Sequence, residues 1–266
     1  MRFLNILLTL SLFTQSSCSL KENSKVSHVA FPQPEYSNQD NNSPNKNIDL
    51  DNSLYNLKDK MPYIPWNFVN DGCWARAEYI SAELALKGIS SGSVNAITCD
   101  TKKGDLEHGL QGPNGVKWYA HVAPIVKTSD SQFVIDPGFS DSPMSIQEWE
   151  QSMGSVRMSH IIDHVGKYQQ TLPDDLACLE TREKSLVPET TAQMRKFSAE
   201  NFLTHCQYFK RFWLDLENSN RATIEERVKA FTALDNRIKY LSEELSKLDL
   251  WDGDIIQECG EPIPAK

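Results

Sequence analysis

The fold of this chain is decided by the stretch Asn70-Asp71-Gly72-Cys73-Trp74-Ala75-Arg76-Ala77. Its cysteine follows a turn-forming Asp-Gly pair and begins a helix-forming segment that is expected to run to Gly88. A thiol at the start of a helix faces unpaired backbone N–H groups and the positive end of the helix dipole, and both favour the thiolate. Cys73 is therefore predicted to be a nucleophile.

Two strand-like runs downstream supply the partners that a cysteine nucleophile needs. The run over residues 116–127 carries His121, and the run over residues 132–136 ends at Asp136. A Cys on a helix, followed by a His on one strand and an Asp on the next, is the order of papain-like and transglutaminase-like thiol enzymes. In this interpretation Cys73 attacks an amide carbonyl and His121 transfers the proton. Asp136 orients the imidazole and stabilises its cation.

The length of the loop between the two runs fixes how they pair. With Lys127 opposite Gln132, Asp136 lies opposite Ala123, and His121 is two residues from Ala123 on the same face of the sheet. Such diagonal neighbours lie about 7–8 Å apart at the backbone, within reach of an imidazole and a carboxylate. A slip of one residue would place the two side chains on opposite faces, so the triad depends on this register.

Four residues near the triad are further candidates for the site. The backbone N–H of Cys73 is expected to bind the oxyanion, with Asn67 and Asn70 as candidate side-chain donors. Trp74 and Tyr119 flank the nucleophile and the base in sequence, and they either line a substrate pocket or pack in the core. No Cys-x-x-Cys pair is present to support a zinc site, and neither a metal nor another cofactor is expected.

The first residues of the chain predict export. Residues 1–18 contain one basic residue and an apolar run too short to span a bilayer, which is typical of a signal peptide. Alternatively, Cys18 is a lipidated first residue that would tether the protein to a membrane. Residues 19–60 are polar and form either a disordered tether or a pro-segment that covers the site. We therefore expect a secreted, periplasmic or cell-envelope protein.

The remaining cysteines and the charge fit an exported protein. Besides Cys73, the chain beyond the signal region has Cys99, Cys178, Cys206 and Cys259. Four cysteines in an oxidising compartment predict two disulfides, with three pairings open. The formal net charge is −9, and the acidic residues are dispersed. This charge argues against nucleic acid and anionic membrane surfaces as partners.

The C-terminal part of the chain has a helical pattern. Residues 61–187 are expected to form the catalytic domain, in which a capping box at Ser145 opens a short helix. In residues 188–266 apolar side chains recur every three or four positions, and a second capping box begins at Thr223. This pattern predicts two antiparallel helices joined near residues 218–220. The helical hairpin either packs on the catalytic domain or is an arm for a protein partner.

The segments that carry the triad resemble a known family. They are residues 64–66 (Ile-Pro-Trp), the stretch 70–77, residues 118–123 (Trp-Tyr-Ala-His-Val-Ala) and residues 134–137 (Val-Ile-Asp-Pro). In this order they are similar to the bacterial secreted protein-glutaminases, over about residues 62–153. The resemblance implies a transglutaminase-like α+β domain, with a Cys-bearing helix on an antiparallel sheet. It also implies catalytic roles for Cys73, His121 and Asp136, and a propeptide.

The same resemblance implies a reaction. Protein-glutaminases hydrolyse the side-chain amide of glutamine to glutamate and ammonia through a Cys thioester, and their substrates are proteins or peptides with exposed glutamine. A transglutaminase and a cysteine peptidase use the same triad and are the alternative enzymes. A non-catalytic binding protein that uses the helical hairpin is the remaining alternative.

Overall fold

The computed structural model describes residues 57–98, 106–107, 109–128, 131–154 and 199–264, together with the backbone of residues 158–164. The predicted signal peptide, residues 19–56 of the predicted tether or pro-segment, Cys99 and Cys178 lie outside these ranges. No helix within them is long and apolar enough to cross a membrane.

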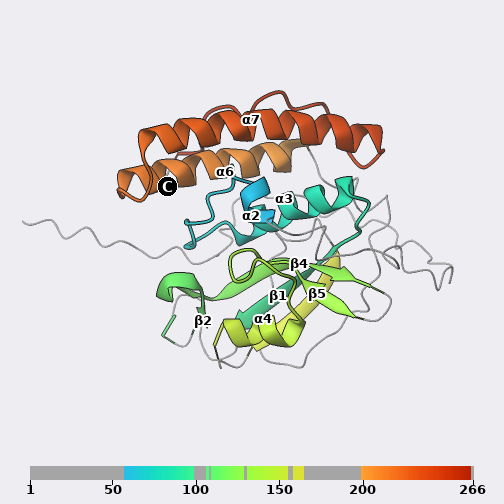
Figure 1. Cartoon of the computed structure of the whole chain (residues 1–266), viewed down its shortest axis with the longest axis vertical. Coiled ribbons are helices and arrows are strands. Elements are labelled where there is room, and N and C mark those ends of the chain that lie inside the picture. Colours follow the sequence, from blue (N-terminus) through green and yellow to red (C-terminus); the bar gives the residue numbers. More distant parts are fainter. Residues whose placement is uncertain are drawn as a thin grey trace, which may run out of the picture.

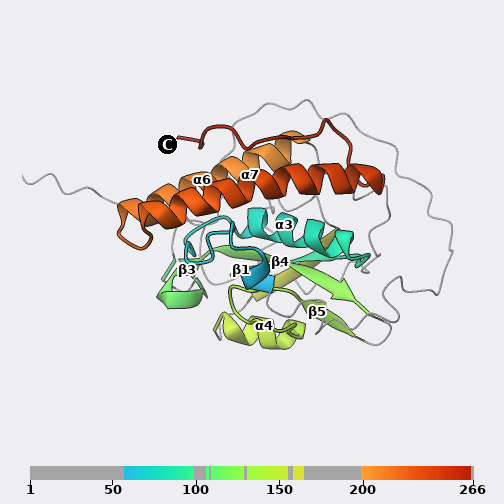
Figure 2. The same cartoon turned by 45° about the horizontal axis from the view of Figure 1, so that its top comes forward.

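The described elements are stacked in layers around one central helix (Figure 1). Helix α3 (Cys73–Leu86) lies between a four-stranded sheet and two long helices, α6 (Ala199–Asn218) and α7 (Ile224–Lys247). The short helix α4 (Ile146–Ser152) lies on the other side of the sheet, and the rotated view in Figure 2 keeps this order. A single turn of helix, α2 (Leu57–Lys60), precedes α3. The structure therefore has the predicted α+β class.

The main sheet is antiparallel throughout. Its strands lie in the order β5-β4-β1-β6, and they are β1 (Gly92–Thr98), β4 (Ala120–Lys127), β5 (Gln132–Val134) and β6 (Met158–His164).

A second, two-stranded sheet divides one of the predicted strands. It pairs β2 (Leu110–Gln111) with β3 (Lys117–Trp118), and the turn η1 (Pro113–Gly115) joins the two. The strand predicted over residues 116–127 is therefore not continuous. It breaks at Tyr119, because β3 pairs with β2 while β4 pairs with the main sheet.

The β4–β5 hairpin has the register expected from its loop length. Lys127 pairs with Gln132. Beyond the end of β5 the N–H of Ile135 donates to the carbonyl of Pro124 (2.9 Å), so the chain keeps the same register. The next residue, Asp136, is consequently held beside β4. The predicted register is confirmed.

The buried side chains form two clusters, one on each side of the sheet. The larger cluster packs α3 against α6, α7 and side chains of β4 such as Val122 and Val126. The smaller cluster lies under α4 and contains Trp118 and Trp149. Helix α3 is buried on nearly every side because it has the sheet on one side and two helices on the other.

Polar contacts join the two long helices to α3. Glu83 of α3 accepts hydrogen bonds from Arg237 of α7 and from the hydroxyl of Tyr63 (2.8 Å). Glu78 of α3 pairs with His205, which is fully buried on α6. The long helices and α3 thus share both a hydrophobic cluster and polar contacts of Glu78 and Glu83. The predicted division at residues 187/188 falls outside the described residues and stays a prediction.

A disulfide holds the C-terminal segment on α6. It joins Cys206 to Cys259, whose Cα atoms are 5.7 Å apart. Beside it, Lys210 Nζ donates to the carbonyl of Gly260 (3.1 Å), and the N–H of Cys259 donates to Asp235 of α7 (2.8 Å). The expectation that the chain forms disulfides is confirmed for this pair.

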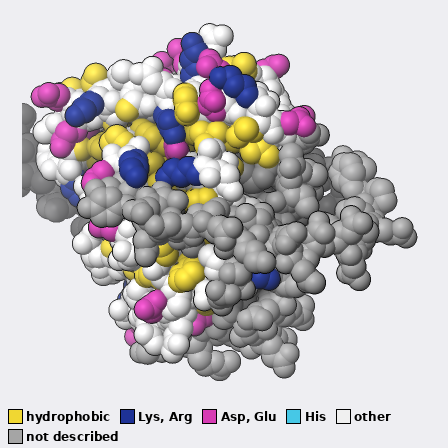
Figure 3. Space-filling view, turned by 45° about the vertical axis from the view of Figure 1, so that its right-hand side comes forward, with side chains coloured by type: hydrophobic (Ala, Val, Ile, Leu, Met, Phe, Trp, Pro, Cys, Tyr) yellow, Lys and Arg dark blue, Asp and Glu magenta, His cyan; other side chains and the backbone are white. Residues whose placement is uncertain are grey.

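The outer surface of the long helices is mixed in character. Ile224, Val228, Tyr240 and Leu248 are large hydrophobic side chains that remain exposed on α7 or at its end. On the face shown in Figure 3, hydrophobic side chains are interspersed with basic and acidic ones. A protein partner of these helices stays a prediction.

Candidate active site

Cys73 is the first residue of α3, and the turn before it sets its position. Gly72 has a left-handed backbone with φ +82°, which glycine adopts without strain. The Oδ1 atom of Asp71 accepts a hydrogen bond from the N–H of Gly72 (2.7 Å). The cysteine is only 4% exposed. The thiol therefore lies at the N-terminus of a buried helix, as the sequence predicts.

Arg76 holds the same turn from inside the protein. Its side chain is buried, and Nη1 donates to the carbonyls of Phe68 and Asp71, each at 3.0 Å. Hydrogen bonds from a charged donor are stronger than neutral ones, so this pair fixes the backbone that leads into Cys73. The positive charge of Arg76 also acts on Asp136, across from α3.

His121 and Asp136 form a buried hydrogen-bonded pair. Nε2 of His121 lies 2.7 Å from Oδ2 of Asp136, and their side chains are 5% and 11% exposed. Cys73 also acts on the imidazole, both through a hydrogen bond and through its charge. Because Asp136 occupies Nε2, Nδ1 is the ring nitrogen that remains for the thiol. The three residues predicted as a triad are thus brought together.

The protonation of this pair is set by mutual attraction. Burial lowers the pKa of His121, but the negative charge of Asp136 and the hydrogen bond to it outweigh burial. Cys73 adds to the rise, and the pKa of His121 is raised from 6.5 to about 9. Burial raises the pKa of Asp136, but His121, Trp149 and Arg76 together hold it below its usual value. An imidazolium–carboxylate pair is therefore the stable form at neutral pH.

Aromatic rings enclose the imidazole of His121. Trp118 stacks on it with ring centroids 4.5 Å apart and an interplanar angle of 14°. Phe139 meets it edge-on at 5.6 Å, and Trp149 lies at 5.7 Å. The indole N–H of Trp118 donates to the carbonyl of Val69, in the turn before Cys73 (2.9 Å). The rings shield the imidazole from water, and Trp118 also connects the sheet to the turn before Cys73.

The four lesser candidates have different places. Asn67 and Asn70 are exposed in the turn before α3. Trp74 points toward α6, where its ring packs on His205 at 4.3 Å and on Tyr208 at 5.2 Å.

Tyr119, the fourth candidate, is half-buried, and its carbonyl accepts a hydrogen bond from the N–H of Thr98 (3.0 Å). The contacts of Trp74 fit the packing alternative, and the role of the Tyr119 side chain stays a prediction. An oxyanion role for Asn67 and Asn70 stays a prediction.

Trp149 and Trp118 contact the predicted catalytic pair and are missing from the expected site. The indole N–H of Trp149 donates to Oδ2 of Asp136 (2.9 Å), and the N–H of Gly138 donates to Oδ1 (3.1 Å). Trp118 does belong to a segment that resembles the family. No local pattern indicates that Trp149 meets Asp136, because the contact joins an isolated short helix to the end of a hairpin.

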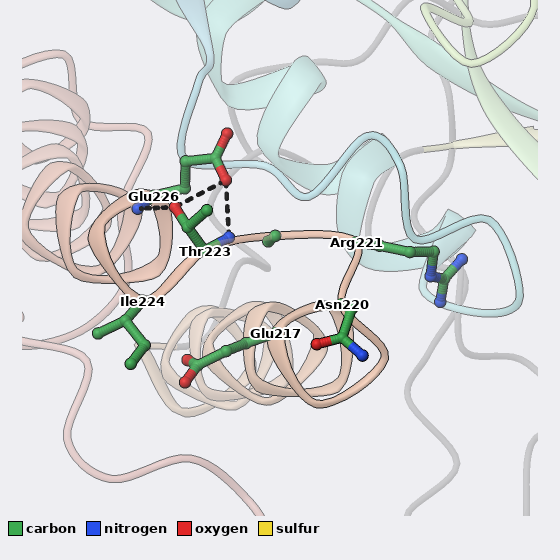
Figure 4. Close-up of a pocket in the computed structure, with 7 residues that line it drawn as sticks. Glu217, Asn220, Arg221, Thr223, Ile224 and Glu226 are labelled. Carbon is green, nitrogen blue, oxygen red and sulfur yellow. Dashed lines mark hydrogen bonds between the residues drawn. The ribbon is translucent and has the colours of Figure 1, made fainter.

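Away from the triad the described residues offer little binding chemistry. They contain no group of three or more His, Cys, Asp or Glu side chains placed to hold a metal ion. A hollow of about 510 Å³ lies at the turn between α6 and α7 (Figure 4). It is lined by Glu217, by residues 220–224 and by Glu226. Within this lining the N–H and the hydroxyl of Thr223 donate hydrogen bonds to Glu226. None of the predicted site residues lines it.

Comparison with known proteins gives one family match, and it covers the residues predicted as a triad. Residues 46–153 match the model of a family described as a glutaminase. The matched residues include α3, the β4–β5 hairpin and α4, and the match ends before α6 and α7. No curated protein matches the chain.

Solved structures of protein-glutaminases align with parts of the chain. The NMR structure of protein-glutaminase from Chryseobacterium proteolyticum has 21% identity and a TM-score of 0.32, and the match covers 42% of this chain and 63% of that one. A crystal structure of protein-glutaminase has 18% identity and a TM-score of 0.37, covering 59% and 84%. A crystal structure of pro-protein-glutaminase has 18% identity and a TM-score of 0.40, covering 66% and 62%. The chain therefore spans less than two thirds of the Chryseobacterium protein.

Proposed function

We propose that this protein is a secreted protein-glutamine glutaminase, which hydrolyses the side-chain amide of glutamine in proteins or peptides to glutamate and ammonia. The observation that carries the proposal is the buried His121–Asp136 pair beside Cys73, within a region of the glutaminase family. A Cys-bearing helix against an antiparallel sheet that carries His and Asp also agrees with a transglutaminase-like or papain-like enzyme.

The reaction proceeds in two halves. In the resting state the thiol proton already lies on His121, so the Cys73 thiolate bonds to the carbonyl carbon of the amide, and the oxyanion that forms accepts a hydrogen bond from the backbone N–H of Cys73. The proton passes from His121 to the amide nitrogen, the C–N bond breaks, and ammonia leaves a thioester. Water then attacks the thioester, His121 takes its proton, and the C–S bond breaks, which restores the thiolate of Cys73 beside the imidazolium of His121. Asp136 orients the imidazole throughout.

The burial of the nucleophile favours a side-chain amide over a main-chain amide. Cys73 and His121 are each 4% exposed. A glutamine carboxamide ends a slim, flexible stem and reaches through a narrow opening, and its leaving group is only ammonia. A main-chain amide carries polypeptide on both sides and needs an open cleft. The burial therefore supports deamidation over peptide cleavage.

The test is incubation of the purified full chain with a glutamine-containing peptide. We expect released ammonia and a peptide whose glutamine has become glutamate, and no change with Cys73→Ala. The control is the double variant Cys206→Ala/Cys259→Ala, which removes both sulfur atoms of the disulfide away from the triad and should still release ammonia. Peptide fragments would instead indicate a peptidase, and incorporation of an added amine would indicate a transglutaminase. An unmodified peptide together with an unreactive Cys73 would favour the non-catalytic binding protein.

The proposal includes a place of action outside the cytoplasm. The predicted signal peptide supports it, and so does the Cys206–Cys259 disulfide, because cytosolic thiols are kept reduced. Fractionation of expressing cells tests it, with Cys18→Ala to separate a lipid anchor from simple secretion. Protein in the cytosolic fraction alone would contradict export. Cleavage ahead of residue 61 tests whether residues 19–60 act as a pro-segment, since removing one would raise activity.

A further inference from the structure

We propose that Trp149 is a positioning residue: its indole N–H holds the carboxylate of Asp136 in the orientation in which that carboxylate orients His121. The inference rests on the proposed function, because it assigns a role within the same triad. It adds a fourth side chain that does not touch the substrate and acts only through Asp136.

The hydrogen bonds of Asp136 define the argument. Its Oδ2 atom receives two donors, Nε2 of His121 at 2.7 Å and Nε1 of Trp149 at 2.9 Å. Its Oδ1 atom receives the backbone N–H of Gly138 at 3.1 Å. With donors on both oxygens, the carboxylate cannot rotate without breaking at least one bond. An indole nitrogen only donates, so the contact with Trp149 exists for a carboxylate oxygen acting as acceptor.

The backbone around Trp149 holds the indole in place. Helix α4 begins at a complete capping box, in which Glu148 accepts from the N–H and hydroxyl of Ser145. Just before it, Met144 forms an antiparallel bridge with Val134, the last residue of β5. Trp149 itself is fully buried. The hairpin that carries Asp136 and the helix that carries Trp149 are therefore fastened to each other directly.

The charges around Asp136 explain why a neutral donor matters there. The cation of His121 faces it from β4, and Arg76 faces it from α3. During the proposed reaction His121 repeatedly gives up its proton and loses its charge, so its hold on Asp136 weakens at those moments. The Trp149 bond does not change with the protonation of His121. It keeps Asp136 ionised and in place, so that Nε2 remains protonated and Nδ1 remains directed at Cys73.

The test compares Trp149→Phe with Trp251→Phe. Both variants remove one indole N–H, but that of Trp251 donates only to the carbonyl of Asp254, in the C-terminal segment. For Trp149→Phe we expect kcat for ammonia release to fall roughly 10- to 100-fold with KM unchanged, the effect of losing one hydrogen bond to a charged group. The acid limb of the pH–rate profile should move to higher pH, because Asp136 protonates more readily. Trp251→Phe should change neither.

A second readout separates this inference from the proposed function. The rate of alkylation of Cys73 by iodoacetamide reports the thiolate–imidazolium pair without any substrate. In Trp149→Phe its pH profile should move as the activity profile does. If the wild-type protein releases no ammonia but Trp149→Phe still moves the pH profile of Cys73 alkylation, the deamidase proposal fails and the role of Trp149 stands. If Trp149→Phe leaves both profiles in place, the role of Trp149 is wrong.

A folding control completes the design. Circular dichroism and thermal unfolding establish whether Trp149→Phe keeps the native structure, since the indole fills the cluster under α4. Where it does not, β-(3-benzothienyl)alanine at position 149 replaces the N–H by sulfur and preserves the shape of the ring system. The same loss of kcat and the same shifts are expected. Unchanged profiles in that variant would overturn the inference.

Discussion

The two sides of the nucleophile turn differ in chemistry. On the sheet side, Cys73 faces a hydrogen-bonded network centred on His121 and Asp136. On the α6 side, the turn meets a wall of aromatic rings: Phe212 stacks on Phe68 at 4.3 Å. A methyl group added to Gly72 would lie 2.5 Å from the same Phe212 ring. One side therefore sets the protonation of His121 and Asp136, and the other packs against the backbone of the turn.

The two sides also differ in their place along the chain. The polar network lies within residues 46–153, which match the glutaminase family model, whereas Phe212 belongs to α6, outside that match. The aromatic wall continues along α3, where Tyr79 stacks on Phe202 at 4.3 Å. The chemistry of the proposed site and the shape of its nucleophile turn therefore come from different parts of the sequence. Substitutions in the polar network should change kcat and its dependence on pH. Substitutions in the aromatic wall should change the free energy of unfolding.

The largest effect is expected on the polar side, from Asp136→Asn. An amide cannot hold the imidazole in the useful tautomer, so kcat for ammonia release should fall roughly a thousand- to ten-thousand-fold. Asp215→Asn makes the same chemical change on α6, away from the proposed site. The carboxylate of Asp215 makes a long ion pair there with Nε of Arg211 (3.9 Å), so the variant should leave kcat unchanged. A loss of less than tenfold for Asp136→Asn would remove Asp136 from the proposed mechanism.

The next effect belongs to the aromatic side, in Gly72→Ala. The substitution combines a left-handed backbone with a contact against Phe212, and it should lower the free energy of unfolding by roughly 2–4 kcal/mol. Gly88→Ala is the matched control, since Gly88 has φ +72° but nothing near its added methyl group. Urea unfolding measures both. Equal losses in the two variants would show that the contact with Phe212 carries no energy; recovery in Gly72→Ala/Phe212→Leu would locate it there.

Between pH 6.5 and 9 the His121–Asp136 pair on the polar side should make the free energy of unfolding depend on pH. The folded protein keeps a proton on His121 up to about pH 9, whereas the unfolded chain loses it near 6.5. The free energy of unfolding should therefore be highest below pH 6.5 and should fall as the pH rises toward 9. Asp136 has a lowered pKa, so its contribution is present above its usual pKa of 3.8 and is lost on further acidification.

Urea unfolding at a series of pH values measures this dependence. Asp136→Asn should flatten the fall between pH 6.5 and 9, and Gly88→Ala should retain it with a uniformly lower stability. A fall of the same size in Asp136→Asn would mean that groups other than the His121–Asp136 pair control it.

The smallest effect compares the two capping boxes. Ser145→Ala and Thr223→Ala each remove a hydroxyl that caps a helix, and each should cost about 1 kcal/mol of stability. Only Ser145→Ala should also lower kcat, because α4 carries Trp149 while α7 carries no residue of the proposed site. Thermal unfolding and ammonia release measure the two quantities. A loss of kcat in both variants would show that the capping of α7 also affects the proposed site, and that the effect of Ser145→Ala is not specific to α4.

Local rules predicted the elements that present the triad. The Asp-Gly pair and the segment after it predicted the turn and helix at Cys73, and loop length alone predicted the pairing of Lys127 with Gln132. Both capping boxes form at the predicted residues, Ser145 and Thr223. These features depend on residues a few positions apart, where turn chemistry and periodicity act directly.

Contacts between distant segments were beyond such rules. Periodicity indicates that Phe212 is buried, but not that its ring lies on Gly72, which is 140 residues away. The pattern around Trp149 likewise predicts a buried ring and says nothing of the acceptor that its N–H meets. Strand β6 pairs with β1 although it lies 60 residues further along the chain. The two strands are not joined by a short turn, so no turn sequence predicts their pairing. These contacts are decided by how whole layers pack.

The close approach of Phe212 to Gly72 has a consequence for protein engineering. A minimal catalytic fragment cut at residue 153, where the family match ends, would leave Phe68 and Gly72 without their aromatic lining and expose them to water. Such a fragment would keep every triad residue and still lack the surface that shapes the nucleophile turn. Grafting this site onto another scaffold would therefore require a substitute for one face of α6.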